Sequence, residues 1–147
     1  MPAREEGSSD LLELRERVRY VLTDKLGSVE VDRDGDFSFP FESTRVFISV
    51  RPFGAGAVIA IDAPVVFGAE PGPDLYEWVA THANDYFIGH LGCELQEEGA
   101  LVLVSHRLFG QFLNPEELLA AVAAVAATAD KLDDELKARF GGERFAD

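Results

Sequence analysis

Hydrophobic and polar residues follow two different periods along this chain, and these periods predict its helices and strands. Between Asp10 and Leu26 apolar residues recur every three or four positions, which predicts an amphipathic helix with Asp10 as its N-cap. From Ser28 to Val66 the period changes to two, and β-branched and aromatic residues become frequent. This stretch is typical of an antiparallel meander of three or four strands.

Two more helices and a second hairpin follow. Asp74 is the predicted cap of a helix that ends at Gly89 or Gly92, and strands at 93–96 and 100–108 come next. Asn114, Pro115 and Glu117 form a strong helix start, and Gly141 is the predicted stop. The order of helix, meander, helix, two-strand hairpin and helix predicts an α+β fold. We expect one domain over residues 10–142, a flexible tail over 1–9 and a short C-terminal tail over 143–147.

The first hairpin has a predictable register. A three-residue loop with Gly35 in the left-handed conformation sets Val31 opposite Phe37, which gathers apolar side chains on one face. Pro40 cannot donate a hydrogen bond to a neighbouring strand, so this strand is expected at a sheet edge or to end near Pro40. The run from Val58 to Ile61 is apolar on both faces and is expected at the centre of the sheet.

The net charge of the chain limits the classes of molecule that it can be expected to bind. The chain has 147 residues, with 27 acidic against 13 basic ones, which gives a net charge of −14 at pH 7. Such a negative field repels phosphate backbones and anionic lipid surfaces, so we expect neither nucleic acid nor membrane as a partner. The sequence contains no apolar run of membrane-spanning length and no apolar core of a signal peptide, so the expected location is the cytoplasm.

The sequence has several candidate metal-binding or reactive residues, but none has the spacing or the neighbours that such a site needs. The turn at Asp32–Asp36 places glycine fourth where a calcium loop needs it sixth, so it is interpreted as a solvated hairpin turn. His82 and His90 are about 12 Å apart if both lie on one helix, too far to share an ion, and His106 has no nearby acid or cysteine in the sequence. Cys93 has no adjacent base or cation. We identify no catalytic residue, metal site or cofactor.

Aromatic residues of the meander are the candidates for binding. Phe37, Phe39, Phe47 and Phe53 exceed what one helix easily covers, and a sheet with an aromatic face or an open edge can accept an extended peptide. The alternative is that these phenylalanines form the core. The alanine-rich stretch at 120–129 of the last helix similarly fits either packing on the chain's own sheet or a dimer contact.

The arrangement resembles a known family. The order of elements is similar to that of the YbjN-like proteins and the class I type III secretion chaperones, and in particular to actinobacterial YbjN-type peptide-binding chaperone domains. The resemblance is carried by Val29–Asp36, Val46–Val50, Asn84, Leu113–Leu118 and Ala129–Gly142. These motifs are specific as a set and weak singly.

The resemblance covers nearly the whole chain, from about Asp10 to Gly142. It implies a non-enzymatic cytoplasmic chaperone or adaptor, often dimeric, that holds a segment of a client protein or peptide. It supplies no catalytic residue. The alternative is a regulatory or structural homodimer that engages a folded partner without a peptide groove.

Overall fold

Six antiparallel strands form one sheet, in the order β1-β2-β3-β4-β6-β5, which confirms the predicted α+β class. A computed structural model describes the backbone of residues 2–146 and the side chains of residues 9–146. The elements are α1 (Pro2–Leu26), β1 (Glu30–Val31), β2 (Phe37–Phe41), β3 (Thr44–Phe53), β4 (Gly56–Ala69), α2 (Pro73–His82), β5 (His90–Gln96), β6 (Gly99–Phe109), the 3-10 turn η1 (Gly110–Phe112) and α3 (Pro115–Phe140).

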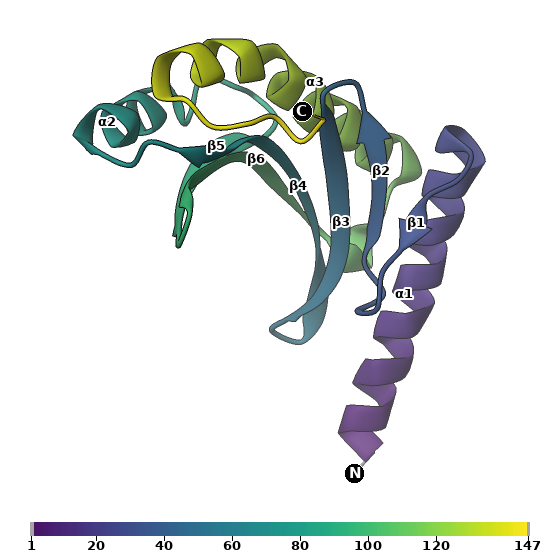
Figure 1. Cartoon of the computed structure of the whole chain (residues 1–147). Helices are drawn as coiled ribbons and strands as arrows, with labels where there is room; N and C mark the ends of the chain where they lie inside the picture. Colours follow the sequence, from purple (N-terminus) through teal and green to yellow (C-terminus); the bar gives the residue numbers. More distant parts are fainter. Residues whose placement is uncertain (1, 147) are drawn as a thin grey trace.

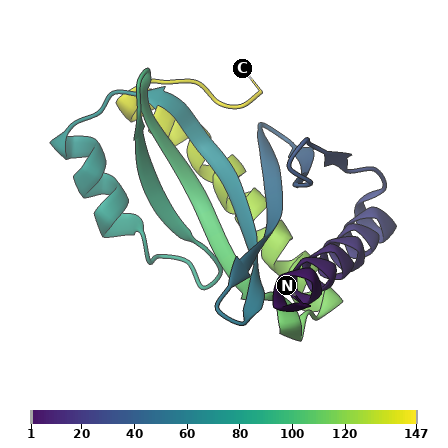
Figure 2. The ribbon, with the colours of Figure 1, turned by 90° about the horizontal axis from the view of Figure 1, so that it is seen from below.

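The sheet is curved, and α3 lies across its convex side (Figure 1). Seen from below, the strands lie in front of α3, with α2 beside one edge of the sheet and α1 beside the other (Figure 2). Two register irregularities, between Pro64 and Val66 and between Val66 and Ala69, interrupt the pairing of β4 with β6. Such bulges bend a strand and increase its twist, so they contribute to the curvature.

The centre of the sheet is where the sequence predicted it. β4 lies between β3 and β6, and Ile59 and Ile61 are fully buried. α3 packs against the face of the sheet on which Ile59 and Ile61 lie. Its buried side chains recur every three or four positions and include Leu118, Val122, Val125, Ala129, Leu132 and Leu136. The Asn114 side chain accepts a hydrogen bond from the Glu117 amide at 3.1 Å, which confirms the predicted cap.

The first helix is longer than predicted. α1 begins at Pro2 and not at Asp10, so the tail expected over residues 1–9 is helical from Pro2; Met1 lies outside the described residues. Proline is well tolerated in the first turn, and the residues that follow it include good helix formers. Leu14, Val18 and Leu22 are buried as the period indicated.

The first hairpin has the predicted register. Val31 pairs with Phe37, and the Asp32 amide donates to the Asp36 carbonyl at 3.0 Å, which leaves a three-residue loop. Gly35 has a φ of 81°, in the left-handed region. β1 pairs with Phe37 and Ser38 alone, so Pro40 lies on a stretch of β2 that is an edge, as expected.

The second helix is shorter than predicted. α2 starts at Pro73 with Gly72 as its cap, and it ends at His82, seven residues before Gly89. The chain turns there because the Asp85 amide donates to the His82 carbonyl and the Leu91 amide to the Ala83 carbonyl. Phe87 lies beyond the end of α2 and is fully exposed.

The residues after α3 return to the sheet. The Glu143 and Phe67 backbones exchange two hydrogen bonds, with N···O distances of 2.9 and 3.0 Å, and the Ala146 amide donates to the Ser43 carbonyl at 3.2 Å. The short tail predicted from residue 143 thus lies against the domain as far as Ala146. No helix in the described part of the chain is both long and apolar enough to cross a membrane.

Candidate binding surface

The sheet face that turns away from α3 is open, and the strand register determines which side chains lie on it. Phe47 of β3 pairs with Asp62 of β4. Asp62 pairs in turn with Ser105 of β6, which pairs with His90 of β5. Directly paired residues point to the same face of a sheet, so these four side chains form one row across four strands. Ile48, next to Phe47, points to the opposite face and is fully buried.

The open face is concave and forms a cavity of about 780 Å³. This volume lies within the range of small-molecule and peptide side-chain pockets. Its apolar lining comes from Phe47, Pro64, Phe67, Leu101, Leu103 and Phe145, and its polar lining includes Asp62, His90, Glu94, Gln96, Ser105 and Arg107. The mixture offers apolar contact area together with hydrogen-bonding groups, which suits an extended peptide laid along the strands.

Three arginines of this face are paired with acids. Arg51 Nη2 lies 2.7 Å from Asp36 Oδ2, Arg107 Nη1 lies 3.2 Å from Asp62 Oδ1, and Arg45 pairs with Glu30 on β1. Exposed ion pairs add little stability, about 0–1 kcal/mol each. Each arginine is neutralised by its acid, so these pairs leave the negative field of a chain whose net charge is −14 unreversed on this face.

Ser105 and Asp62 do not form a nucleophile and its base. The Ser105 hydroxyl donates to Asp62 Oδ1 at 2.5 Å, and Arg107 Nη1 donates to the same oxygen at 3.2 Å. An activated serine donates instead to a histidine that a carboxylate orients. Here Asp62 is engaged by a hydroxyl and a guanidinium, an arrangement that fixes the polar row of the open face.

The three histidines have separate surroundings. His82 stacks on Trp78 with ring centroids 4.1 Å apart, and its Nδ1 lies 2.7 Å from the Trp78 carbonyl. His90 is on the open face, whereas His106 is on the opposite face of the sheet and its Nδ1 accepts a hydrogen bond from the Gly89 amide. Burial lowers the pKa of His106, with His90 as the second cause.

Cys93 is half-buried on β5, on the face opposite His90. Burial raises the pKa of its thiol, and the nearby Glu94 carboxylate raises it further. A thiol with a raised pKa has less thiolate at neutral pH and reacts slowly. The environment is that of an unreactive structural cysteine, as its sequence context indicated.

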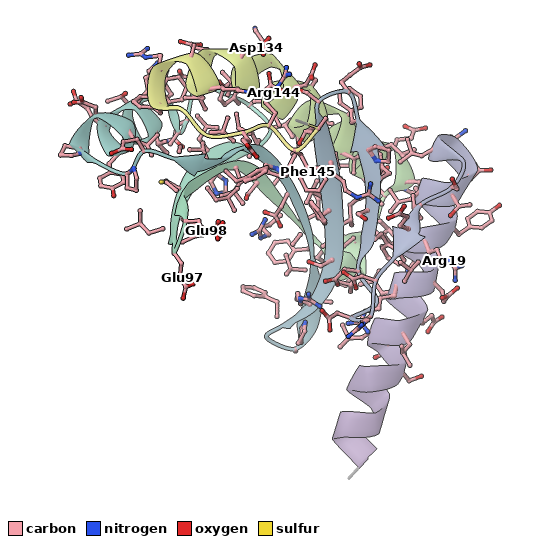
Figure 3. All side chains as sticks on the ribbon, viewed as in Figure 1. Arg19, Glu97, Glu98, Asp134, Arg144 and Phe145 are labelled. Carbon is pink, nitrogen blue, oxygen red and sulfur yellow. The ribbon has the colours of Figure 1, made fainter. Side chains whose placement is uncertain are left out.

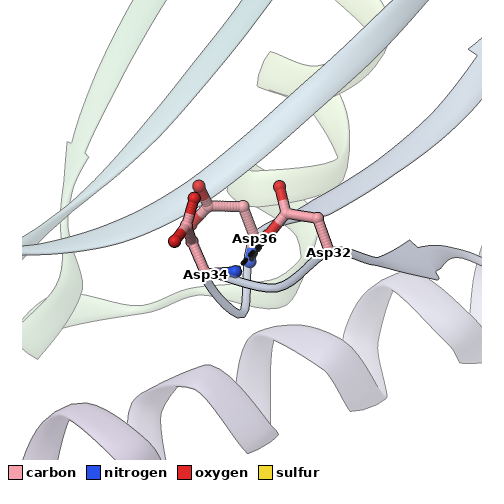
Figure 4. A group of neighbouring side chains, drawn as sticks. All are labelled: Asp32, Asp34 and Asp36. Atoms are coloured by element: carbon pink, nitrogen blue, oxygen red, sulfur yellow. Dashed lines mark hydrogen bonds between the residues drawn. The ribbon is translucent and has the colours of Figure 1, made fainter.

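Three carboxylates meet at the first hairpin turn. One ligand oxygen each from Asp32, Asp34 and Asp36 lies within 4.8 Å of the others (Figure 4). Asp32 Oδ1 accepts hydrogen bonds from the amides of Asp34 at 2.8 Å and Asp36 at 3.0 Å, and Arg51 contacts Asp36. Asp32 therefore closes the turn and Arg51 supplies a positive charge, which accounts for the cluster as part of the hairpin.

The four candidate phenylalanines do not share one surface. Phe37 and Phe39 are 3% and 8% exposed and belong to the core, because they pair with the buried Ile48 and Val46 and point to the same face of the sheet as those residues. Their assignment to a binding surface is corrected. Phe47 lies on the open face, half-buried. Phe53 is 61% exposed near the β3–β4 turn, with its ring 6.2 Å from that of Phe109.

Several lining residues were missed by the sequence analysis. Leu101 and Leu103 alternate with the buried Val102 and Val104, so β6 is apolar on both faces. A run that is apolar on both faces is the same signal that placed β4 at the centre of the sheet, and it indicates an apolar second face on β6 as well. Phe145 gave no such signal, because its position depends on the path of the chain after α3.

Comparison with protein families identifies one match. The family model described as T3SS (YopN, CesT) and YbjN peptide-binding chaperone 1 matches residues 12–147. The comparison with curated proteins found no matching relative.

Solved structures share the fold at low sequence identity. A chain in the crystal structure of the ExsC–ExsE complex is 21% identical, with a TM-score of 0.63 over 84% of this chain and 96% of that one. A chain in the HopA1–SchA chaperone–effector complex is 14% identical, with a TM-score of 0.62 over 86% and 97%. YbjN from E. coli is 16% identical, with a TM-score of 0.65 over 85% and 92%.

Proposed function

Because the chain belongs to the family of T3SS (YopN, CesT) and YbjN peptide-binding chaperones, we propose that it holds an extended segment of a client protein on the open face of its sheet. The observation that carries the proposal is the concave face itself. It has a cavity of about 780 Å³ with apolar and polar lining, and α3 covers the other face. An extended peptide on such a face gains apolar contact and hydrogen bonds together.

The proposal is for binding without catalysis. The matched family is a family of chaperones. The hydroxyl, carboxylate and imidazole groups of the open face lie in one row across the sheet, and the Asp62 carboxylate in that row accepts hydrogen bonds from Ser105 and Arg107. We place this activity in the cytoplasm. Structures of chaperone–effector complexes with the same fold support a client that is a protein or a peptide.

Cross-linking from the open face tests this function. Glu94 is exposed and lines the cavity, so a photo-reactive benzophenone residue at this position should cross-link to a client in cells. Digestion and mass spectrometry should map the cross-links to one extended segment of the client. Phe47→Ala should reduce their yield by about tenfold, because a buried aromatic contact in a binding site is worth about 1.4 kcal/mol or more.

The same photo-reactive residue at Ala127 is the matched control. Ala127 is exposed on α3, on the far side of the sheet. Cross-links from position 127 to the surface of a folded partner or to a second copy, with none from position 94, would contradict the proposal. They would favour instead a regulatory or structural dimer that engages partners through its helices.

A further inference from the structure

The segment Glu143–Ala146 occupies a strand position at one rim of the open face. Pairing of β3 with β4 runs from Phe53 and Gly56 to Phe47 and Asp62, so the last residues of β4 extend past it. Beside them Glu143 exchanges two backbone hydrogen bonds with Phe67.

A glycine is needed for this close approach. Gly142 has a φ of 86°, and a Cβ at this position would lie 2.6 Å from the Phe67 carbonyl oxygen. The chain can therefore come down onto the edge of β4 only because residue 142 has no side chain.

The segment also places an aromatic side chain in the cavity. Phe145 packs edge-on against Phe47, with ring centroids 6.0 Å apart and an interplanar angle of 68°. Both rings line the cavity of the open face. Figure 3 shows Phe145 below the segment, on the side away from α3, while Arg144 turns toward Asp134 of α3 with a 3.0 Å ion pair.

Backbone pairing at a sheet edge and a side chain in an adjacent pocket are the two components of strand-type peptide recognition. We propose that Glu143–Ala146 is an internal occupant of the client site, and that a client displaces it. This inference rests on the proposed function. The occupant indicates the chemistry of the client: an extended segment with an aromatic residue two positions after the residue that pairs with Phe67.

Few contacts hold the internal occupant. Phe145 is 44% exposed, the segment makes three backbone hydrogen bonds through Glu143 and Ala146, and Arg144 forms an ion pair with the exposed carboxylate of Asp134. A short tether gives a segment an effective concentration of about 1 mM at its own site. A client must compete with that concentration, so weakly binding peptides are excluded while a well-matched segment enters.

A peptide supplied in trans tests the inference. The probe is a fluorescently labelled Gly-Gly-Glu-Arg-Phe-Ala-Asp, the sequence of residues 141–147. A chain that stops at Gly142 should bind it about tenfold or more tightly than the unchanged chain, whose site is already occupied. Replacing phenylalanine by alanine in the probe should weaken binding about tenfold, as should Phe47→Ala in the shortened chain.

A point variant tests the inference without shortening the chain. Phe145→Ala in the full chain should release the segment and bind the probe several-fold more tightly than the unchanged chain. Phe87→Ala is the matched control, since Phe87 is fully exposed outside the cavity, and it should bind as the unchanged chain does. Circular dichroism melting checks that each variant is folded. If the shortened chain is unfolded, the affinity of the probe for Phe145→Ala decides the test.

Equal affinity of the probe for the unchanged chain and Phe145→Ala would overturn the inference, as would a probe whose phenylalanine does not matter. These outcomes are separate from a failure of the proposed function. Cross-links from position 94 to a client report on the function, and they need no release of Glu143–Ala146. Probe titration needs no client.

Discussion

Phe37 and Phe47 belong to adjacent strands and have opposite surroundings. Phe37 is 3% exposed and pairs with the buried Ile48, whereas Phe47 lies on the open face and contacts Phe145. A core phenylalanine supplies stability through burial and close packing. A phenylalanine on an open face supplies contact area that a partner can use.

Alanine substitution should separate these two roles. Phe37→Ala should lower the free energy of unfolding by about 3–5 kcal/mol, because it removes a buried ring and leaves a cavity. Phe47→Ala should lower it by about 1 kcal/mol and should instead weaken the binding of client. Denaturant unfolding measures the first quantity and titration the second. Equal losses of stability in the two variants would contradict the assignment of Phe47 to a binding surface.

At the scale of elements, α3 depends on its cap. The Asn114 side chain accepts from the Glu117 amide, and Pro115 occupies the first turn. Asn114→Ala should therefore lower the free energy of unfolding by about 1 kcal/mol, measured by denaturant titration. Asn84→Ala, at an exposed position after α2, should change it by less than about 0.5 kcal/mol. A loss as large at Asn84 would mean that capping is not the cause.

Features that depend only on residues close together in the chain could be predicted from the sequence. The cap of α3 and the register of Val31 with Phe37 each follow from residues within a few positions of one another. The end of α2 could not be predicted in this way, because the turn after His82 depends on hydrogen bonds that bring β5 back to the sheet. Nor does any local signal in the sequence indicate that the second hairpin joins the meander by pairing β6 with β4.

The binding surface shows the same division. All the phenylalanines were candidates because the meander has more aromatic residues than one helix easily covers. The pairing of β2 with β3 then sets Phe37 and Phe39 on the buried face and Phe47 on the open one, a distinction that a count of aromatic residues does not make. The row from Asp62 to Ser105 requires the pairing of β4 with β6, which joins residues 43 positions apart.

At the scale of the whole molecule, charge and shape act together. The net charge is −14, and Arg45, Arg51 and Arg107 on the open face are each neutralised by an acid, so they do not reverse that charge. A long-range negative field attracts basic segments, so under the proposed function we expect the client segment to be basic or amphipathic and to meet both apolar and polar contacts on the open face.

Salt should therefore affect the encounter with a basic client more than the bound state. Raising NaCl from about 0.1 M to about 1 M shortens the screening length from about 10 Å to about 3 Å. For a basic peptide from the cross-linked client, the association rate should fall about tenfold and the dissociation rate should change little. Stopped-flow fluorescence measures both. A peptide with glutamine at its basic positions is the control, and an identical salt dependence for the two peptides would contradict steering by charge.

The path of the chain after α3 has a practical consequence. Ala146 donates to the Ser43 carbonyl and directly follows Phe145, which lines the cavity, and the N end of α1 lies well away from the C-terminal end (Figure 1). Anything joined to the C-terminal end, whether an affinity tag, a fluorescent protein or a further domain, follows closely on the segment whose Phe145 lines the surface that a ligand must reach. Labels for capture or imaging are better attached ahead of α1, where they leave that approach open.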